Sequence, residues 1–179
     1  MSDRSFWHGA RAAATAGALL AGLAAMPAFA GFFDRDEPEG GRQELPTPPP
    51  PPLRTNNLVP IASPPDSSVD IGVDPASLTM AADDIVRYVS VARSRAGTAM
   101  NATYEGIRCS TAEVKLYARH YADGDWQPQE KPVWVSLYEP KARTSLAIAK
   151  AGVCQDAAPN SSPQKMLIDM RGNPNRGTP

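Results

Sequence analysis

The stretch Asn101-Ala-Thr-Tyr-Glu-Gly-Ile-Arg-Cys109 decides the fold, because it joins a strand-like pattern to one of only 2 cysteines in the 179 residues. The other cysteine is Cys154. The part of the chain able to build a core lies around and between these two positions, since the residues before about position 80 are signal-like or proline-rich. The fold therefore depends on what the two cysteines close.

Residues 1–30 have the pattern of a secretory signal peptide. Arg4 and Arg11 give a positive start, an alanine- and leucine-rich apolar run follows, and Pro27-Ala-Phe-Ala30 ends in the small-x-small pattern that signal peptidase accepts. We expect cleavage after Ala30 and localisation in the periplasm or cell envelope. The alternative is a retained membrane anchor, which the shortness and the alanine content of the apolar run disfavour.

Export makes a disulfide between Cys109 and Cys154 the default expectation, because two cysteines in an oxidising compartment pair. Closing a loop of about 45 residues stabilises a domain by about 4 kcal/mol in the chain-entropy model. For a small domain this is a large share of the free energy of unfolding.

Residues 31–75 are predicted to form a disordered, proline-rich acidic linker. The segment contains the run Pro48–Pro52 and few large apolar residues, so it cannot bury enough surface to offset the entropy of ordering. Up to Asp74 it has eight acidic residues against three basic ones. An extended segment of this kind is either a ligand for a proline-recognising partner, a spacer, or a passive linker, and composition alone favours the passive linker.

The remainder of the chain, from Pro75, is mildly basic, with 13 basic residues against 10 acidic ones. This balance is too weak to argue for nucleic-acid binding but is compatible with anionic ligands of the cell envelope.

From Asp83 the pattern changes to that of β-strands. Alternating apolar residues separated by turn signals predict four strands, at 85–93, 100–109, 114–121 and 133–137. Gly106, inside the second strand, indicates a bulge or a close backbone approach. Trp126, which follows the third strand, is predicted to anchor the core.

Residues 141–151 are predicted to form a helix that ends at Gly152, with Pro140 in its first turn. The residues spaced for one covered face are Leu146, Ala147 and Lys150.

The fold class is therefore α+β: a small antiparallel sheet of about four strands covered by a C-terminal helix, with one disulfide pinning the helix to the second strand. We place this domain at residues 76–158. The tail, residues 159–179, is predicted to be mostly disordered, with residues 166–170 adding at most one edge strand.

Several short strings then point to a family. They are Tyr104-Glu-Gly-Ile-Arg-Cys109, Val114-Lys-Leu-Tyr-Ala118, Gly124-Asp-Trp126 and the late Cys154. Together they resemble the cryptic neisserial protein 1-like family of exported proteobacterial proteins, over residues 83–154. The stretch 147–153 departs from the resemblance, since aromatic residues are expected there. The resemblance implies an exported envelope protein with no established biochemical role, and it supplies no catalytic residues.

Motifs for catalysis, metals or cofactors are not recognisable, so we expect no metal and no cofactor. His120 is predicted to be an ordinary strand residue with satisfied hydrogen bonds. Two acidic pairs, Glu105 with Glu113 and Asp123 with Asp125, leave open the alternative of a secreted hydrolase with paired carboxylates. Solvated strand and turn charges are the simpler interpretation of these acids.

A candidate binding face follows from strict alternation along the second and third strands. If Cys109 faces the helix, the opposite side of the sheet carries Tyr104, Arg108, Lys115, Tyr117, Arg119 and Tyr121. Aromatic rings among cations bind sugars or anionic groups such as phosphates. The plainer alternative is a solvent-facing side whose cross-strand pairs only stabilise the sheet.

These observations favour a non-enzymatic exported module that works through binding. Its predicted partner is an envelope component or another periplasmic protein. Nucleic acid is not expected as a partner, and no stable membrane span is expected to remain after cleavage.

Overall fold

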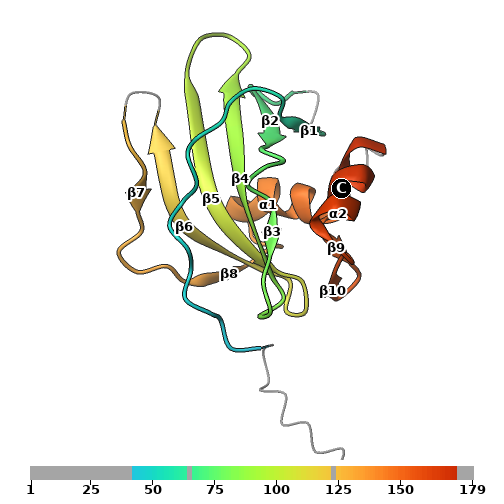
Figure 1. Ribbon diagram of the computed structural model, residues 1–179. Coiled ribbons are helices and arrows are strands. Elements are labelled where there is room, and N and C mark those ends of the chain that lie inside the picture. The colour runs from blue at the N-terminus through green and yellow to red at the C-terminus, as the bar shows by residue number, and fades with distance from the viewer. Residues whose placement is uncertain (1–41, 64–65, 122–123, 173–179) are drawn as a thin grey trace, which may run out of the picture. The chain divides into compact units, whose positions relative to one another are not determined.

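The structure is a computed structural model, and it describes residues 42–63, 66–121 and 124–172 (Figure 1). By its internal contacts the chain divides into two units, Met1–Arg35 and Asp36–Pro179, and every described residue belongs to the second. The predicted signal peptide, with its cleavage site at Ala30, lies outside the described residues. Within the described part, none of the helices has the length and apolar composition needed to cross a membrane.

The centre of the fold is an antiparallel sheet in which three long strands lie side by side. These are β4 (Ile85–Ser94), β5 (Met100–Arg108) and β6 (Glu113–Tyr121). Short strands extend the sheet beyond β4 and beyond β6. They are β1 (Val59–Ile61), β2 (Val69–Val73), β3 (Thr79–Met80), β7 (Gln127–Pro128) and β8 (Trp134–Ser136).

The α+β fold with an antiparallel sheet is confirmed, but over the described residues the sheet has eight strands where four were predicted. All four predicted strands form, the last of them as β8 on the edge of β6. The additional strands are 2 to 5 residues long, too short to show a period-2 pattern in the sequence. Among the short strands, only β8, which lies within the apolar stretch 133–137, was predicted.

Both faces of the sheet are covered. Along β4, Val86 and Tyr88 belong to a core beneath the helices, whereas Val89 and Val91 belong to a second apolar cluster on the opposite face. All four side chains are almost completely inaccessible to solvent. The sheet is thus the middle layer of the fold, and the covering of its second face is the main departure from the predicted arrangement.

The predicted helix is confirmed over Pro140–Val153, as three consecutive pieces. A short 3-10 helix, η1 (Pro140–Ala142), leads into α1 (Arg143–Ile148), and the π-helical segment η2 (Ala149–Val153) continues it. Ile148 and Val153 are completely buried against the sheet. The face predicted to be covered is only partly buried, and its residues line a pocket that is described below.

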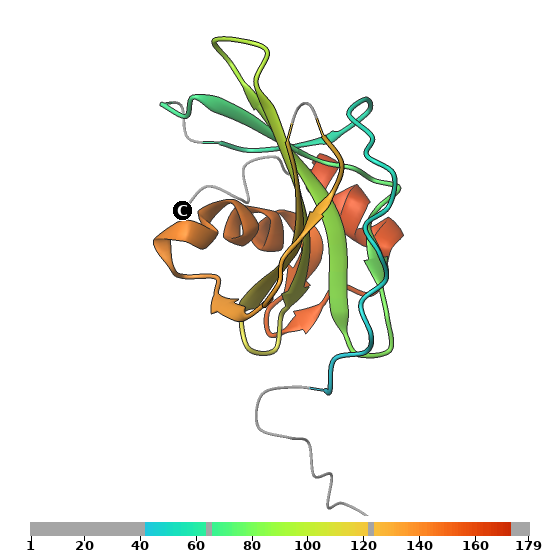
Figure 2. The same ribbon diagram turned by 90° about the vertical axis from the view of Figure 1, so that its left-hand side faces the viewer.

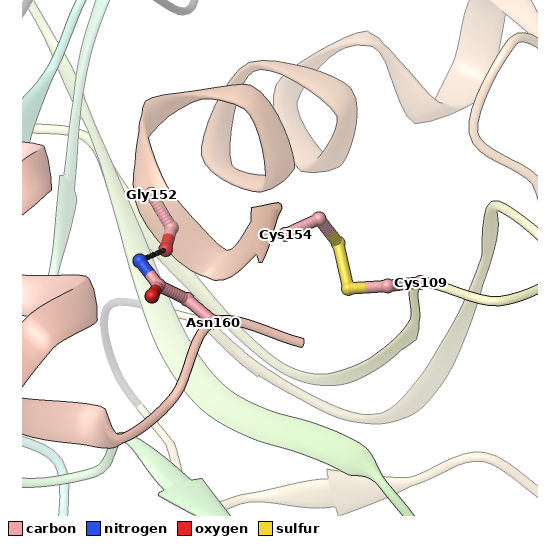
Figure 3. The surroundings of a disulfide bond; sticks show 4 residues. All are labelled: Cys109, Gly152, Cys154 and Asn160. Atoms are coloured by element: carbon pink, nitrogen blue, oxygen red, sulfur yellow. Dashed lines mark hydrogen bonds between the residues drawn. A yellow bond between two sulfur atoms is a disulfide. The ribbon is translucent and has the colours of Figure 1, made fainter. Parts of the chain in front are cut away.

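The disulfide between Cys109 and Cys154 is confirmed, with the two Cα atoms 5.7 Å apart (Figure 3). It joins the residue after β5 to the residue after η2. Beside it, the Asn160 side-chain amide donates a hydrogen bond of 3.1 Å to the Gly152 carbonyl oxygen (Figure 3). Gly152 is needed here, because a Cβ at this position would lie 2.8 Å from the Met166 carbonyl oxygen.

Much of the segment predicted as a disordered linker is part of the fold, which corrects the boundary at residue 76. Its described residues supply β1 and β2, and residues 42–55, named here the proline strap, run across the sheet face opposite α1 (Figures 1 and 2). The physical reason is that the strap needs no core of its own, since the sheet supplies the apolar surface that composition lacks.

The tail also differs from its prediction. Residues 166–170 lie within helix α2 (Pro163–Gly172), not in an edge strand or a disordered segment. Met166 and Met170, four residues apart, are buried in the core, and the Ser162 hydroxyl accepts a hydrogen bond of 3.2 Å from the Lys165 N–H as an N-cap. Ser162 and Pro163 are an N-cap and first-turn proline that the sequence analysis did not recognise. A small two-stranded sheet, β9 (Cys154–Gln155) with β10 (Ala158–Pro159), links η2 to α2.

Removing the disulfide tests how far it stabilises the helical layer. We expect Cys109→Ser and Cys154→Ser each to lower the free energy of unfolding by about 4 kcal/mol, because each opens the same loop. The double variant should lose no more than either single variant. Urea denaturation at pH 7 measures all three, and additive losses would show that the thiols act separately.

Candidate functional site

The six residues of the predicted binding face do not share one face of the sheet, because β6 contains a bulge. In the pairing of β5 with β6, Tyr104 lies opposite Ala118 and Glu105 lies opposite Leu116, so that Tyr117 is an extra residue. A bulge of this kind breaks the alternation of side chains along the strand. The residues of β6 before and after Tyr117 therefore follow different phases.

The bulge divides the predicted set into two groups. Tyr104 and Tyr117 pack together in the cluster beneath the proline strap, and their ring centroids are 5.5 Å apart. Arg119 instead lines a pocket beside Ser145 of α1, on the helix side, and Tyr121, two residues further, follows the same phase and is exposed. The six residues thus do not form one contiguous face. That hypothesis assumed that side chains alternate strictly along β6, and the bulge at Tyr117 interrupts the alternation.

Gly106 makes room for this arrangement. A Cβ at Gly106 would lie 2.6 Å from the Tyr117 hydroxyl oxygen and 2.9 Å from an Ile85 methyl carbon. The Tyr117 ring therefore lies directly over the backbone of β5. Both features that were considered for Gly106 are present, a bulge nearby and a close approach.

Arg108 and Lys115 belong to the strap side and surround one indole ring. The guanidinium carbon of Arg108 lies 4.2 Å from the centroid of Trp134, and the Lys115 ammonium nitrogen lies 4.7 Å from it. Arg108 also forms an ion pair of 3.7 Å with Glu113, the residue paired with it across the strands. These cations are thus engaged within the domain.

The proline strap occupies the face that was predicted to bind a ligand. The Glu44 carboxylate forms an ion pair with Lys115 and accepts a hydrogen bond of 2.8 Å from the Tyr117 hydroxyl. Tyr104 and Tyr117 are consequently only 3% and 8% exposed. The cation-and-aromatic chemistry inferred from the sequence is real, but the acid it binds belongs to the same chain.

A second set of contacts holds the strap where it passes β4. Arg87, 2% exposed, forms a buried ion pair of 2.8 Å with Asp83. The Leu45 N–H donates a hydrogen bond of 3.0 Å to the Asp83 carboxylate, and the Leu45 carbonyl oxygen accepts one of 3.4 Å from Arg87. Buried charges need partners of this kind, so the strap backbone adds hydrogen bonds to both members of the pair, although the Nε atom of Arg87 has no partner among the described residues.

Trp126 anchors the far part of the strap, in keeping with its predicted role. Its indole N–H donates a hydrogen bond of 2.9 Å to the Pro51 carbonyl oxygen, and its ring packs edge-on to His120 at 5.3 Å. The Nδ1 atom of His120 is buried and has no hydrogen-bond partner among the described residues, unlike the satisfied histidine that was expected.

The strap contacts change the ionisation of the groups that make them. Burial acts to raise the pKa of the Glu44 carboxyl, but the hydrogen bonds from Lys115 and Tyr117 outweigh it, so this pKa lies below its ordinary value. The pKa of Asp83 is lowered in the same way: burial opposes ionisation, and the hydrogen bonds from Arg87 and Leu45 more than compensate. Burial and the hydrogen bond to Glu44 raise the pKa of the Tyr117 hydroxyl. The strap is therefore held by ionised carboxylates.

A cavity lies on the other face of the sheet, between α1 and the strands β1 and β2. Its volume is about 580 Å³, within the usual range for small-molecule sites. Apolar side chains form much of its walls, and the acidic residues Asp66 and Glu139 also line it. The apolar residues include Ile61, Val69, Ile71, Leu137 and Leu146. This amphipathic pocket is the candidate functional site, and no prediction from the sequence identified it.

One face of the helix contributes both apolar and positively charged side chains to the amphipathic pocket. Arg143, Leu146, Ala147 and Lys150 line it with the i, i+3, i+4, i+7 spacing of one helix face. The cations at the two ends are about 10 Å apart along the helix axis. Neither Arg143 nor Lys150 forms an ion pair with any residue that the structure describes. The spacing of Leu146, Ala147 and Lys150 indicated this helix face in the sequence, but it was interpreted as a face covered by the sheet.

A smaller cavity of about 220 Å³ contains Glu105. The Glu105 carboxylate accepts hydrogen bonds from the Tyr88 hydroxyl at 2.8 Å and from the Ser145 hydroxyl at 2.9 Å. Among the described residues no second carboxylate lines this cavity, and Glu113 is paired with Arg108 on the strap side of the sheet. Asp123 lies outside the described residues, so the other acidic pair is not described.

Metal ligation has no support in the described ranges, 42–63, 66–121 and 124–172, where no group of three or more potential ligands gathers.

The model of the CNP1-like family matches residues 38–171, from just before the proline strap to the end of α2. Comparison with curated proteins and with solved structures gives no match. The matched range includes most of the two segments predicted to lie outside the domain, namely residues 38–75 and 159–171.

The ionised strap contacts predict how stability depends on pH. A carboxyl whose pKa is lower in the folded chain contributes stability fully above its unfolded value, near 4, and this contribution is lost as the pH falls through the folded value. Both Glu44 and Asp83 are lowered, so the free energy of unfolding should decrease below about pH 4.

Glu44→Gln should lower the free energy of unfolding by about 1–2 kcal/mol at pH 7 and reduce its decrease in acid. Glu130→Gln, at an exposed position, is the matched control and should change neither. Urea denaturation from pH 7 to pH 3 measures both effects. An unchanged pH dependence in Glu44→Gln would contradict the role given to this carboxylate.

Proposed function

Because the chain belongs to the CNP1-like family, a family of uncharacterised function, we propose its function from its own geometry: it is an exported envelope module that binds an amphipathic anion in the amphipathic pocket. The observation that carries this proposal is the pairing of apolar walls with two cations, Arg143 and Lys150, that have no ion-pair partner among the described residues. A ligand with a hydrocarbon body and a negatively charged end fits both properties.

The disulfide supports the exported part of the proposal. Structural disulfides persist in oxidising compartments such as the bacterial periplasm and are rare in the cytosol. The signal-like residues 1–30 support it independently. The partner class that follows is a component of the envelope with an acyl or similarly apolar group, in place of the phosphate-bearing ligand first considered for the strap side.

The hydrolase alternative gains no support from the geometry around Glu105. Both hydroxyl groups near this carboxylate donate to it, and paired-carboxylate hydrolysis needs a second acid at a fixed separation. Binding without chemistry therefore remains the function that the pocket supports best.

Octanoate is a suitable probe, because it combines a hydrocarbon body with a single carboxylate. Burying the six methylene groups and the methyl group of octanoate at about 0.8 kcal/mol each gives a dissociation constant on the order of 0.1 mM. Isothermal titration calorimetry measures it. Ala147→Trp, which fills the pocket, should abolish binding, whereas Ala157→Trp, at an exposed position outside the pocket, should not.

The charge requirement is tested separately with 1-octanol. The double variant Arg143→Gln/Lys150→Gln should bind octanoate about 3- to 10-fold more weakly and octanol with unchanged affinity. Equal loss for both probes would show that the cations act only on the shape of the pocket. Octanoate binding that persists in Ala147→Trp would place the site elsewhere.

A further inference from the structure

The proline strap meets the sheet along one row of its side chains. Its half-buried residues recur every third position, as Glu44, Thr47, Pro50 and Leu53, with Pro51 and Thr55 also half-buried. Three residues per turn is the period of the polyproline II helix. The burial period of residues 44–53 therefore matches that of a polyproline II segment with one of its three rows facing the sheet.

A second row faces solvent and consists of prolines. Pro46, Pro49 and Pro52 are all exposed, and they follow one another at the Pro-x-x-Pro spacing. At about 3.1 Å per residue, successive members of this row lie about 9 Å apart. Domains that recognise proline-rich peptides receive this spacing in grooves lined by aromatic side chains.

The strap differs from a free proline-rich peptide because its conformation is already fixed. Glu44 is held by Lys115 and Tyr117, and Pro51 is held by Trp126. A partner that binds a preformed polyproline II row does not bear the entropy of ordering it. Folding has thus prepared the exposed row for recognition.

A cleft beside the exposed row adds a second, independent feature. It has a volume of about 350 Å³ and is lined by Pro48 and Pro49 of the strap and by Pro128 and Pro132 from the other side. Proline rings make up much of its walls, and the ion-paired Glu44 and Lys115 also line it. Proline and tyrosine rings offer an aromatic side chain an apolar surface. An aromatic ring of a partner that grips the row can enter here.

We propose that the row Pro46–Pro49–Pro52, with the adjoining cleft, is a docking surface for a protein partner whose groove is lined by aromatic side chains. This surface lies on the strap side of the sheet, opposite α1 and the amphipathic pocket, so it is a second site that does not depend on the proposed ligand (Figure 2). The partner binds the exposed row while the strap stays bound to the sheet.

The first experiment asks whether the row can be read on the folded chain. The probe is an SH3 domain chosen because it binds the free peptide of residues 44–54. It should bind the full chain at least as tightly as the peptide. The triple variant Pro46→Ala/Pro49→Ala/Pro52→Ala should bind roughly tenfold more weakly or worse, which corresponds to 1.4 kcal/mol. Pro60→Ala, an exposed proline in β1, is the matched control and should bind normally.

Two outcomes of this titration overturn the proposal. One is binding of the peptide but not of the chain. The other is binding accompanied by a shift of the Trp126 indole N–H resonance to its free position, which would mean that the strap leaves the sheet. Circular dichroism verifies that the triple variant folds, and the single variant Pro49→Ala replaces it if it does not.

The second experiment addresses the partner in the cell envelope. A photoreactive phenylalanine analogue at Leu45, an exposed position in the neighbouring row, should give one discrete crosslinked product in intact cells. The peptide of residues 44–54 should compete with its formation in isolated envelopes, and Pro46→Ala/Pro52→Ala should reduce it while Pro60→Ala does not. Absence of a product, or a product insensitive to these changes, overturns the proposal.

Discussion

The guanidinium group of Arg87 is buried in the middle of the sheet, and the fold must supply partners for its charge. Arg87 is almost completely buried, and it is compensated by Asp83 and by the backbone of Leu45. Removing one partner from a buried ion pair costs about 3–5 kcal/mol, because the other charge is left without compensation. The sheet face therefore needs the proline strap, and the strap in turn needs the sheet, since its prolines cannot build a core alone.

The two faces of the sheet are covered by different means, and this explains where the open surfaces lie. On one face, helices and the disulfide between Cys109 and Cys154 make an apolar core. The short α1 does not reach over β1 and β2 completely, which leaves the amphipathic pocket between them. On the other face, a single extended segment covers the aromatic cluster with one row of side chains. Its remaining rows stay available.

The elements that could be predicted from the sequence are those with a local pattern. The long strands show period-2 alternation, the helix shows its spacing and its first-turn Pro140, and the cysteine pair follows from export. The strap could not be predicted, because a proline-rich segment becomes ordered only against a surface that binds it, and its sequence does not show that surface. The phase of β6 after Tyr117 was wrong for a related reason: a bulge depends on the partner strand, and Gly106 indicated it without giving its position. For α2 the local signal existed in Ser162, Pro163 and the spacing of Met166 and Met170, and it was overlooked in a polar, proline-rich tail.

The distance along the chain between the strap and its contacts has a consequence for the order of folding. The hydrogen bonds and ion pairs that join the strap to the rest of the fold link residues 20 to 75 positions apart, from Arg54 with Asp74 to Trp126 with Pro51. Contacts of such separation form late, because the loops between them must close first. The strap leaves the ribosome before any strand of the sheet, yet it can settle only after β4 and β6 are in place. Until then the rings of Tyr104 and Tyr117 face solvent. The step in which the strap binds the sheet is therefore also the step that buries this aromatic pair.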